Sequence, residues 1–101
     1  MRQAAKRDAN EKEIVKALAA AGCSVTQLSG PGIPDLLVSR AGVNYLLEVK
    51  DPSQPLCKQA LTPMQEIWHR DWRGQKAVVK TVDEALAAVG LSKHRLKELE
   101  A

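Results

Sequence analysis

Cysteine is scarce in this sequence, and apolar runs long enough to cross a membrane are missing. The two cysteines, Cys23 and Cys57, belong to no CxxC motif and to no Cys/His cluster, which excludes a disulfide scaffold. We expect free thiols in a reducing cytoplasm, although the sequence leaves open whether folding brings the two together. No signal peptide precedes the first expected helix, so we expect a cytoplasmic protein without a membrane-bound form.

Internal repeats, low-complexity segments and a large excess of one charge are also missing. The 101 residues suffice for one domain with one core, so we expect residues 1–101 to form a single domain. Hydrophobic residues make up 45% and charged residues 27% of the chain, as in ordinary soluble globular proteins. The net charge of +3 permits a polyanionic partner such as nucleic acid but does not demand one.

Helical periodicity near the N-terminus is followed by three short apolar runs. Ile14, Val15 and Leu18 recur at helical spacing, which predicts a helix over residues 8–21 that ends at Gly22. The three runs predict strands, and the last two are close enough in sequence to form a hairpin. The expected strands cover residues 23–28, 35–40 and 45–50, with a turn at 41–44 and a polar loop over 51–60.

Three capping signals coincide at the start of the second helix. Thr62 fits the N-cap, Pro63 fits the first helical position, and Gln65 completes a capping box. We expect this helix to run to about Arg73. A contiguous apolar run then predicts a fourth strand over residues 76–80.

The C-terminal part completes the expected architecture. Thr81 and Glu84 suggest a second capping box, for a helix that stops at Gly90, and Ser92 suggests the cap of a final charged helix. The strand–helix–strand unit predicts that the third and fourth strands are parallel, while the first three suit an antiparallel meander. We therefore expect an α/β fold with an αβββαβ core, in which helices flank a mixed four-stranded sheet.

Three ionisable residues are predicted to converge at one end of this sheet. Glu48 and Lys50 are two positions apart and share one face of their strand, and Asp35 opens the strand before it. Two neighbouring carboxylates repel each other, and a divalent cation would relieve that repulsion. The alternatives are a surface ion pair on an edge strand for Glu48 and Lys50, and a solvated loop-end carboxylate or a turn cap for Asp35.

A fourth carboxylate faces the expected core. Glu11 precedes Ile14, Val15 and Leu18 by spacings that place it on the apolar stripe of the first helix. A carboxylate that faces a core is costly unless it is paired or bound to a metal. The alternative is an acid in the first turn, where the helix dipole favours it.

The order and spacing of these motifs resemble those of a nuclease superfamily. The dipeptide PD at 34–35, followed by EVK at 48–50, resembles the PD-(D/E)XK signature, and the expected element order is similar to the restriction-endonuclease-like core of that superfamily. The stretch EKEIV at 11–15 resembles the first helix of archaeal Holliday-junction resolvases. The stretch LTPMQ at 61–65 resembles the VRR-NUC branch, especially its short stand-alone phage and bacterial members. The resemblance covers roughly residues 8–89.

This resemblance implies a metal-dependent DNA endonuclease that uses Mg²⁺ or Mn²⁺ and no small-molecule cofactor. It implies that Asp35 and Glu48 are metal ligands and that the carbonyl of Val49 is a candidate third ligand. Lys50 corresponds to the catalytic lysine, and Glu11 to an active-site residue of the resolvases. The implied setting is the cytoplasm of a bacterial cell or of a phage-infected host.

The resemblance also concerns Gln65, the substrate and the assembly. Gln65 matches a glutamine that the VRR-NUC branch carries after the core strands, and its part in the capping box is an equal alternative. Because no sequence-reading helix or zinc finger is evident, we expect a homodimer that recognises branched DNA, such as a Holliday junction, in repair or recombination. Candidates for phosphate contacts are Lys58, Lys12 and Arg7, with ordinary solvated surface charge as the alternative.

Three other functions are compatible with the sequence. The chain could be a catalytically inactive nucleic-acid-binding module of the same fold, an interaction subunit without a DNA role, or a sequence-specific nuclease of the restriction type. The presence of Glu11, Asp35, Glu48 and Lys50 at all four expected polar positions favours an active enzyme. The small size and the missing recognition element disfavour the sequence-specific nuclease.

Overall fold

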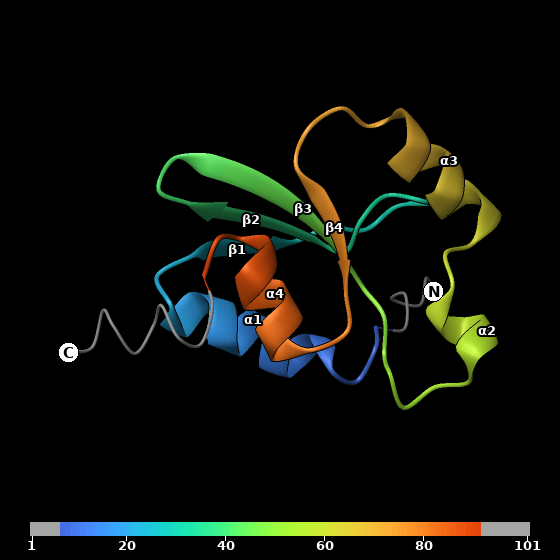
Figure 1. Ribbon diagram of the computed structural model, residues 1–101, viewed down its shortest axis with the longest axis horizontal. Coiled ribbons are helices and arrows are strands. Elements are labelled where there is room, and N and C mark those ends of the chain that lie inside the picture. Colours follow the sequence, from blue (N-terminus) through green and yellow to red (C-terminus); the bar gives the residue numbers. More distant parts are fainter. Residues whose placement is uncertain (1–6, 92–101) are drawn as a thin grey trace, which may run out of the picture.

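Helices and strands follow one another in the expected αβββαβ order, with one additional short helix. The computed structural model describes residues 7–91, and its ribbon is shown in Figure 1. The elements in chain order are α1 (Glu11–Ala20), β1 (Ser24–Gln27), β2 (Leu36–Arg40), β3 (Val43–Val49), α2 (Leu56–Gln59), α3 (Pro63–Asp71), β4 (Lys76–Val79) and α4 (Val82–Ala88).

The sheet has the predicted mixed topology. Its strand order is β1-β2-β3-β4; β2 pairs with β1 and β3 in antiparallel fashion, and β4 runs parallel to β3. Strand β3 is therefore an interior strand with hydrogen-bonded neighbours on both sides. Its residue Leu47 lies opposite Leu36 of β2 and opposite Ala77 of β4. The expected meander and the expected parallel crossover are both confirmed.

Two helices and one face of the sheet enclose the hydrophobic core. Figure 1 shows α1 and α4 side by side against this face. Successive side chains of a strand alternate between faces, and Leu47 and Val49 of β3 are at most 1% exposed. The predicted helical stripe supplies Ile14 and Leu18, both fully buried in the same cluster. The opposite face is more open, because Leu37 of β2 is 36% exposed there.

The turn between β2 and β3 is tighter than predicted. Only Ala41 and Gly42 connect the strands, with positive φ angles of 51° and 79°. Positive φ at both central positions is typical of a type I′ hairpin turn, whose twist matches that of the flanking strands. The predicted turn over 41–44 was therefore two residues too long, because the next two residues extend the ladder of hydrogen bonds instead.

Three predictions about the helices need correction. The loop predicted over 51–60 contains the single turn of α2, which buries none of its residues. The first helix begins at Glu11, later than expected. At the start of α4, Thr81 Oγ1 accepts from the N–H of Glu84 (3.1 Å), but the Glu84 carboxylate accepts from the N–H of Lys80 (2.8 Å), so the second capping box is only half formed.

The two cysteines are free thiols, as expected. Cys23 is buried in the core, and Cys57 is exposed. Within residues 7–91, no helix is both long enough and apolar enough to cross a membrane. The final helix expected after Ser92 lies outside the described residues.

Asn10, the residue before α1, joins that helix to the ends of two strands. Its Nδ2 donates to the carbonyl oxygens of Lys50 (2.9 Å) and Lys80 (2.8 Å). Because the side chain is used in this way, it makes no cap hydrogen bond to α1. Its Oδ1 is buried and has no hydrogen-bond partner among the described residues. One side chain thus connects the ends of the parallel strands β3 and β4.

Replacing this amide should destabilise the fold. We expect Asn10→Ala to lower the free energy of unfolding by about 1–3 kcal/mol, because two carbonyl groups lose their shared donor. Urea denaturation followed by circular dichroism measures the change. The control is Asn44→Ala at an exposed position of β3, which should change stability by less than about 0.5 kcal/mol. Equal stability of Asn10→Ala and the wild type would contradict the bridging role.

Candidate active site

Glu48 lies near the C-terminal end of β3, Lys50 directly follows this strand, and both side chains are shielded from solvent. Their exposed fractions are 2% and 7%, respectively. They alternate along the chain with Leu47 and Val49 and therefore point away from the core face of the sheet. Because β3 is an interior strand, the alternative of a surface ion pair on an edge strand is wrong. The burial of Glu48 and Lys50 therefore has to be explained by something other than an ordinary solvated surface position.

Asp35 lies immediately before β2, at the end of the hairpin away from the turn. Its N–H donates to the carbonyl oxygen of Leu47 (3.1 Å), which extends the β2–β3 ladder by one step. Its Oδ2 accepts from the N–H of Val49 (2.7 Å). Continued by one position, the register of the two strands places Asp35 opposite Glu48. The hairpin thus brings these two carboxyl groups together.

Glu48 is an acid whose charged form is disfavoured. Burial raises the pKa of Glu48 to about 9, and a hydrogen bond with Asp35 and the charge of Asp35 act in the same direction, whereas Lys50 acts weakly against them. The Oε1 atom of Glu48 is buried without a hydrogen-bond partner in the described part of the chain. Without a cation, the protonated form of Glu48 is therefore favoured, as expected for an acid that is desolvated beside a second carboxyl group.

Gln65 links Lys50 to the start of α3. Its Oε1 accepts from Lys50 Nζ (2.8 Å) and also from the N–H of Thr62 (2.9 Å). The Thr62 hydroxyl in turn accepts from the N–H of Gln65 (3.3 Å), which completes the capping box. The two interpretations of Gln65 are therefore compatible, because one side-chain oxygen caps the helix and contacts the lysine.

Glu11 faces the interior, as its place on the apolar stripe predicted. It is 2% exposed, and its Oε2 accepts from Arg7 Nε (2.5 Å) and from Gln27 Nε2 (2.8 Å). The structure thus pairs this buried carboxylate with a guanidinium and an amide. Its link to the carboxyl pair is indirect, because Arg7 also donates to the main-chain oxygen of Asp35 (3.1 Å).

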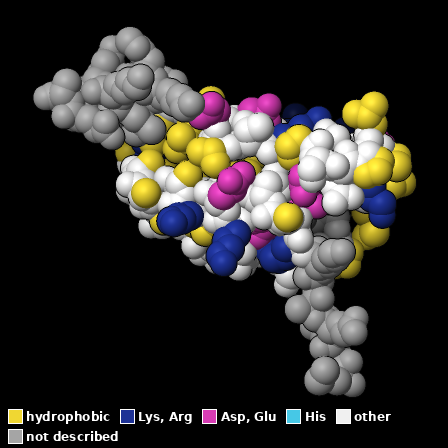
Figure 2. Space-filling view, turned by 90° about the horizontal axis from the view of Figure 1, so that it is seen from below, with side chains coloured by type: hydrophobic (Ala, Val, Ile, Leu, Met, Phe, Trp, Pro, Cys, Tyr) yellow, Lys and Arg dark blue, Asp and Glu magenta, His cyan; other side chains and the backbone are white. Residues whose placement is uncertain are grey.

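The three candidates for phosphate contacts have different surroundings. Lys12 on α1 and Lys58 on α2 are exposed, whereas the side chain of Arg7 is 29% exposed and paired with Glu11. Arg7 and Lys58 line one surface hollow of about 360 Å³. The face drawn in Figure 2 shows Lys and Arg side chains interspersed with Asp and Glu, so the basic charge is not gathered in one field on that face.

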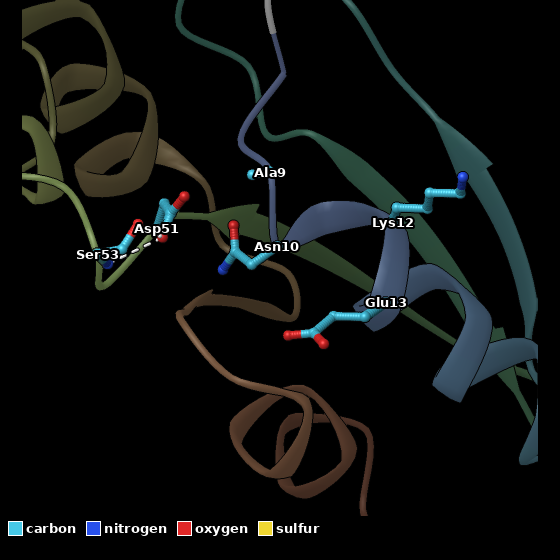
Figure 3. Close-up of a pocket in the computed structure, with 6 residues that line it drawn as sticks. All are labelled: Ala9, Asn10, Lys12, Glu13, Asp51 and Ser53. Carbon is cyan, nitrogen blue, oxygen red and sulfur yellow. Dashed lines mark hydrogen bonds between the residues drawn. The ribbon is translucent and has the colours of Figure 1, made fainter.

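Asp51 is a further acid beside the site that sequence reasoning did not single out. It follows Lys50 directly and is 5% exposed. It accepts from the N–H (2.9 Å) and the hydroxyl (2.7 Å) of Ser53, and these bonds lower the pKa of Asp51. Figure 3 shows Asp51 and Ser53 across a cavity of about 440 Å³ from Asn10 and Glu13. In the sequence, only its position directly after Lys50 indicated that Asp51 lies beside the site.

Asp8 and His69 also lie within electrostatic range of the site. Burial, followed by the charge of Asp35, raises the pKa of Asp8. Burial, followed by the charges of Lys76 and Lys50, lowers the pKa of His69. Nothing in the sequence around either residue indicates this, because it is the fold that brings these distant segments together.

The residues fit a hard divalent cation held by two carboxylates. Asp35 and Glu48 supply oxygen donors of the kind that Mg²⁺ and Mn²⁺ prefer, and a cation would satisfy the buried Oε1 of Glu48. Among residues 7–91, no group of three or more His, Cys, Asp or Glu side chains is placed to hold a metal. Main-chain and water oxygens would have to complete the coordination, as is usual for Mg²⁺.

The fold matches a solved structure described as a VRR_NUC domain. The two chains are 29% identical, the alignment covers 74% of this chain and 84% of the other, and the TM-score is 0.60. The chain is therefore similar to this VRR_NUC domain in fold and, over the aligned part, in sequence. No protein-family profile and no curated protein matches it. The VRR-NUC fold is that of a nuclease-type domain, so the resemblance seen in the sequence is confirmed at this level.

The pH dependence of stability tests the carboxyl pair of Asp35 and Glu48. The folded-state pKa of Glu48, about 9, is above the ordinary value of 4.5, so the folded protein binds this proton more tightly than the unfolded chain. The stability from this group is complete below about pH 4.5 and is lost as the pH rises toward about 9. In metal-free buffer at pH 8, Glu48→Gln should therefore exceed the wild type in free energy of unfolding by about 1–3 kcal/mol.

Urea denaturation in EDTA at pH 5 and pH 8 measures this difference, which should shrink at pH 5. The control is Glu13→Gln, which removes an exposed acid from the first turn of α1 and should show no such trend. Parallel stability curves for the wild type and Glu48→Gln across this range would mean that Glu48 carries no proton in the folded domain.

Proposed function

We propose that this domain is a metal-dependent, structure-selective DNA endonuclease that hydrolyses phosphodiester bonds. The observation that carries the proposal is the pair of the partly exposed Asp35 and the buried Glu48 beside the buried Lys50 at one end of the sheet. A phosphodiester is negatively charged, and its hydrolysis adds charge to the phosphate oxygens, so it needs preorganised positive charge close by. The carboxyl pair offers a site for a cation, and Lys50 offers a fixed ammonium.

Asp35 and Glu48 are the proposed ligands of Mg²⁺ or Mn²⁺, with the carbonyl of Val49 as the third candidate. The N–H of Val49 holds one oxygen of Asp35 (2.7 Å) and leaves the other for a ligand. When bound, the cation would lower the pKa of a coordinated water and stabilise charge on the phosphate. A site with few protein ligands keeps positions free for that water and for a phosphate oxygen.

Lys50 is the proposed catalytic lysine. Its ammonium carries three donors, and one of them is directed at Gln65 Oε1 (2.8 Å). The other two are available for a phosphate oxygen or for the attacking water. In this mechanism water attacks the phosphorus in line with the leaving oxygen, and Lys50 neutralises charge that develops on the phosphate. Gln65 and Glu11 complete the proposed site, Gln65 by orienting the lysine.

Branched DNA such as a Holliday junction is the proposed substrate, in repair or recombination, and a homodimer is the proposed assembly. Helix α3 exposes Met64 (56%) and Ile67 (51%), and its C-cap residue Trp72 is 41% exposed. Figure 2 shows hydrophobic side chains gathered at the end of the molecule that carries α2 and α3 in Figure 1. Exposed apolar side chains of this kind are typical of protein contacts. Two copies joined there would present two active sites to one junction.

The second candidate function is a catalytically inactive nucleic-acid-binding module of the same fold. It is favoured by the lack of a third suitably placed acid within the described range 7–91. Such a module would bind branched DNA equally well after Asp35→Ala or Lys50→Ala and would never cut it. An interaction subunit without a DNA role would show no salt-dependent DNA binding at all.

Cleavage assays on the wild type and Lys50→Met test the proposed activity. We expect the wild type to cut labelled four-way-junction, flap or linear duplex DNA in Mg²⁺ or Mn²⁺ and not in EDTA. Lys50→Met keeps the length of the side chain and removes its charge, so cleavage should fall by at least about 100-fold. Lys16→Met, at an exposed position of α1, is the control and should retain the rate of the wild type.

Each other outcome of these assays points to a different function. Binding of junction DNA without any cutting would favour the inactive module. Cutting that survives Lys50→Met would place the active site elsewhere or indicate a contaminating nuclease. Linear duplex cut as fast as junction DNA would contradict structure selectivity.

The proposed phosphate contact of Lys58 predicts a salt-dependent loss of DNA affinity. At an ionic strength of 0.1 M, Lys58→Ala should weaken junction binding by about two- to tenfold, and it should lower the slope of log Kd against log salt concentration by about 1. Fluorescence anisotropy over a salt series measures both quantities. An unchanged slope, equal to that of the exposed-site control Lys16→Ala, would show that Lys58 makes no phosphate contact.

A further inference from the structure

The segment that precedes α1 reaches the start of β2 through the side chain of Arg7. We propose that Arg7 is a positioning residue that sets the place of Asp35, and that Glu11 acts through Arg7. This inference rests on the function proposed above for Asp35. It differs from the role that the sequence suggested for Arg7, which was a direct contact with DNA phosphates.

Arg7 makes hydrogen bonds to three separate segments of the chain. Its Nε donates to Glu11 Oε2 (2.5 Å), and one terminal nitrogen donates to the main-chain oxygens of Leu28 (3.0 Å) and Asp35 (3.1 Å). Gln27 Nε2 donates to the same oxygen of Glu11 (2.8 Å). The guanidinium is thereby held between α1, the end of β1 and the start of β2.

The carbonyl that Arg7 contacts belongs to the residue whose carboxylate is proposed to bind metal. Besides Arg7, the oxygen of Asp35 accepts from the N–H of Leu28 (2.8 Å), and the N–H of Asp35 donates to Leu47 (3.1 Å). The Asp35 carboxylate extends from this peptide to the N–H of Val49 (2.7 Å). A shift of the peptide would therefore shift the carboxylate relative to Glu48.

The geometry requires an arginine in particular. Only a planar guanidinium offers several fixed N–H donors at once, whereas a lysine ammonium is a single point charge on a flexible stem. The carboxylate of Glu11 is nearly fully buried, at 3% side-chain exposure. A buried carboxylate is costly unless it is paired, and within the described residues Arg7 and Gln27 are its hydrogen-bond partners. Glu11 therefore fixes the guanidinium, and the guanidinium fixes Asp35.

Arg7→Lys distinguishes a positioning residue from a phosphate contact, because it keeps the positive charge and removes the fixed N–H donors of the guanidinium. We expect the single-turnover cleavage rate at saturating junction DNA to fall about 10- to 100-fold, as for a misplaced reactive group. The Kd for junction DNA, measured in Ca²⁺, should stay within about twofold because the charge is retained. Lys16→Gln, at an exposed position of α1, is the control and should change neither quantity.

The Val49 amide provides a readout that does not depend on activity. Its N–H donates to Asp35 Oδ2, so its proton chemical shift in ¹H–¹⁵N spectra reports where the carboxylate lies. We expect this resonance to move upfield in Arg7→Lys, recorded in EDTA, and to stay in place in Lys16→Gln. A purely structural role would lower the melting temperature and leave both this resonance and the cleavage rate of the folded protein unchanged.

Glu11→Gln provides a second variant that removes the ion pair with little change in shape. If Glu11 acts through Arg7, the Val49 resonance should move in the same direction as in Arg7→Lys. If Glu11 instead acts directly at the reacting atoms, cleavage will fall while the Val49 resonance stays in place, which would overturn the inference. A weaker Kd with an unchanged rate in Arg7→Lys would overturn it as well. If the wild type cuts no DNA, the proposed function fails, and the Val49 resonance still decides whether Arg7 positions Asp35.

Discussion

The antiparallel pairing of β2 with β3 is the constraint on which the rest of the site depends. The two-residue turn at 41–42 sets the register of these strands, and the register places Asp35 opposite Glu48. A slip of one residue would exchange the faces of β3, so that Leu47 would leave the core and Glu48 would enter it. Turn geometry at one end of the hairpin therefore decides whether a carboxyl pair exists at the other end.

The carboxyl pair is an unsatisfied arrangement that the remainder of the fold sustains. The pKa of Glu48 is raised to about 9, and its Oε1 has no hydrogen-bond partner within residues 7–91, so the described residues do not fully satisfy this acid. The core face of the same strand offsets this cost, because burying a side chain such as Leu47 or Val49 contributes about 1.5–3 kcal/mol. A site that binds a cation has to leave some charge uncompensated in its absence, and stability is the usual cost of such a site.

Elements with strong local signals could be predicted from the sequence. Local signals of a few residues predicted a helix from the stripe of Ile14 and Leu18, a strand from the apolar run of β4, and a helix start from the cap at Thr62. The structure contains all three. The turn was predicted over 41–44, two residues too long, because its first position is Ala41, and a positive φ is uncommon for alanine. The single turn of α2 buries no residue, and so it leaves no hydrophobic periodicity to detect.

The sequence predicted the site residues that lie on or beside the strands of the hairpin. Strand alternation was enough to place Glu48 beside Lys50, and the hairpin was enough to bring Asp35 to the same end of the sheet. The stripe also predicted that Glu11 faces the interior, but not what it meets there. Its partner Arg7 contacts a main-chain oxygen 28 positions away. Because every residue carries the same main-chain carbonyl group, no residue type in the sequence indicates this contact.

The first helix connects the core to the charged end of the sheet. Its stripe is held in the core by Ile14 and Leu18, while the side chains of Arg7 and Asn10 just before it reach the main-chain oxygens of Asp35 and Lys50. Because these donors bind the backbone, they leave the Asp35 and Lys50 side chains available for a cation and for a phosphate. Packing on one face of the sheet thus controls the position of the charged groups on the other face. A shift of α1 against the core would move Asp35 and Lys50 together.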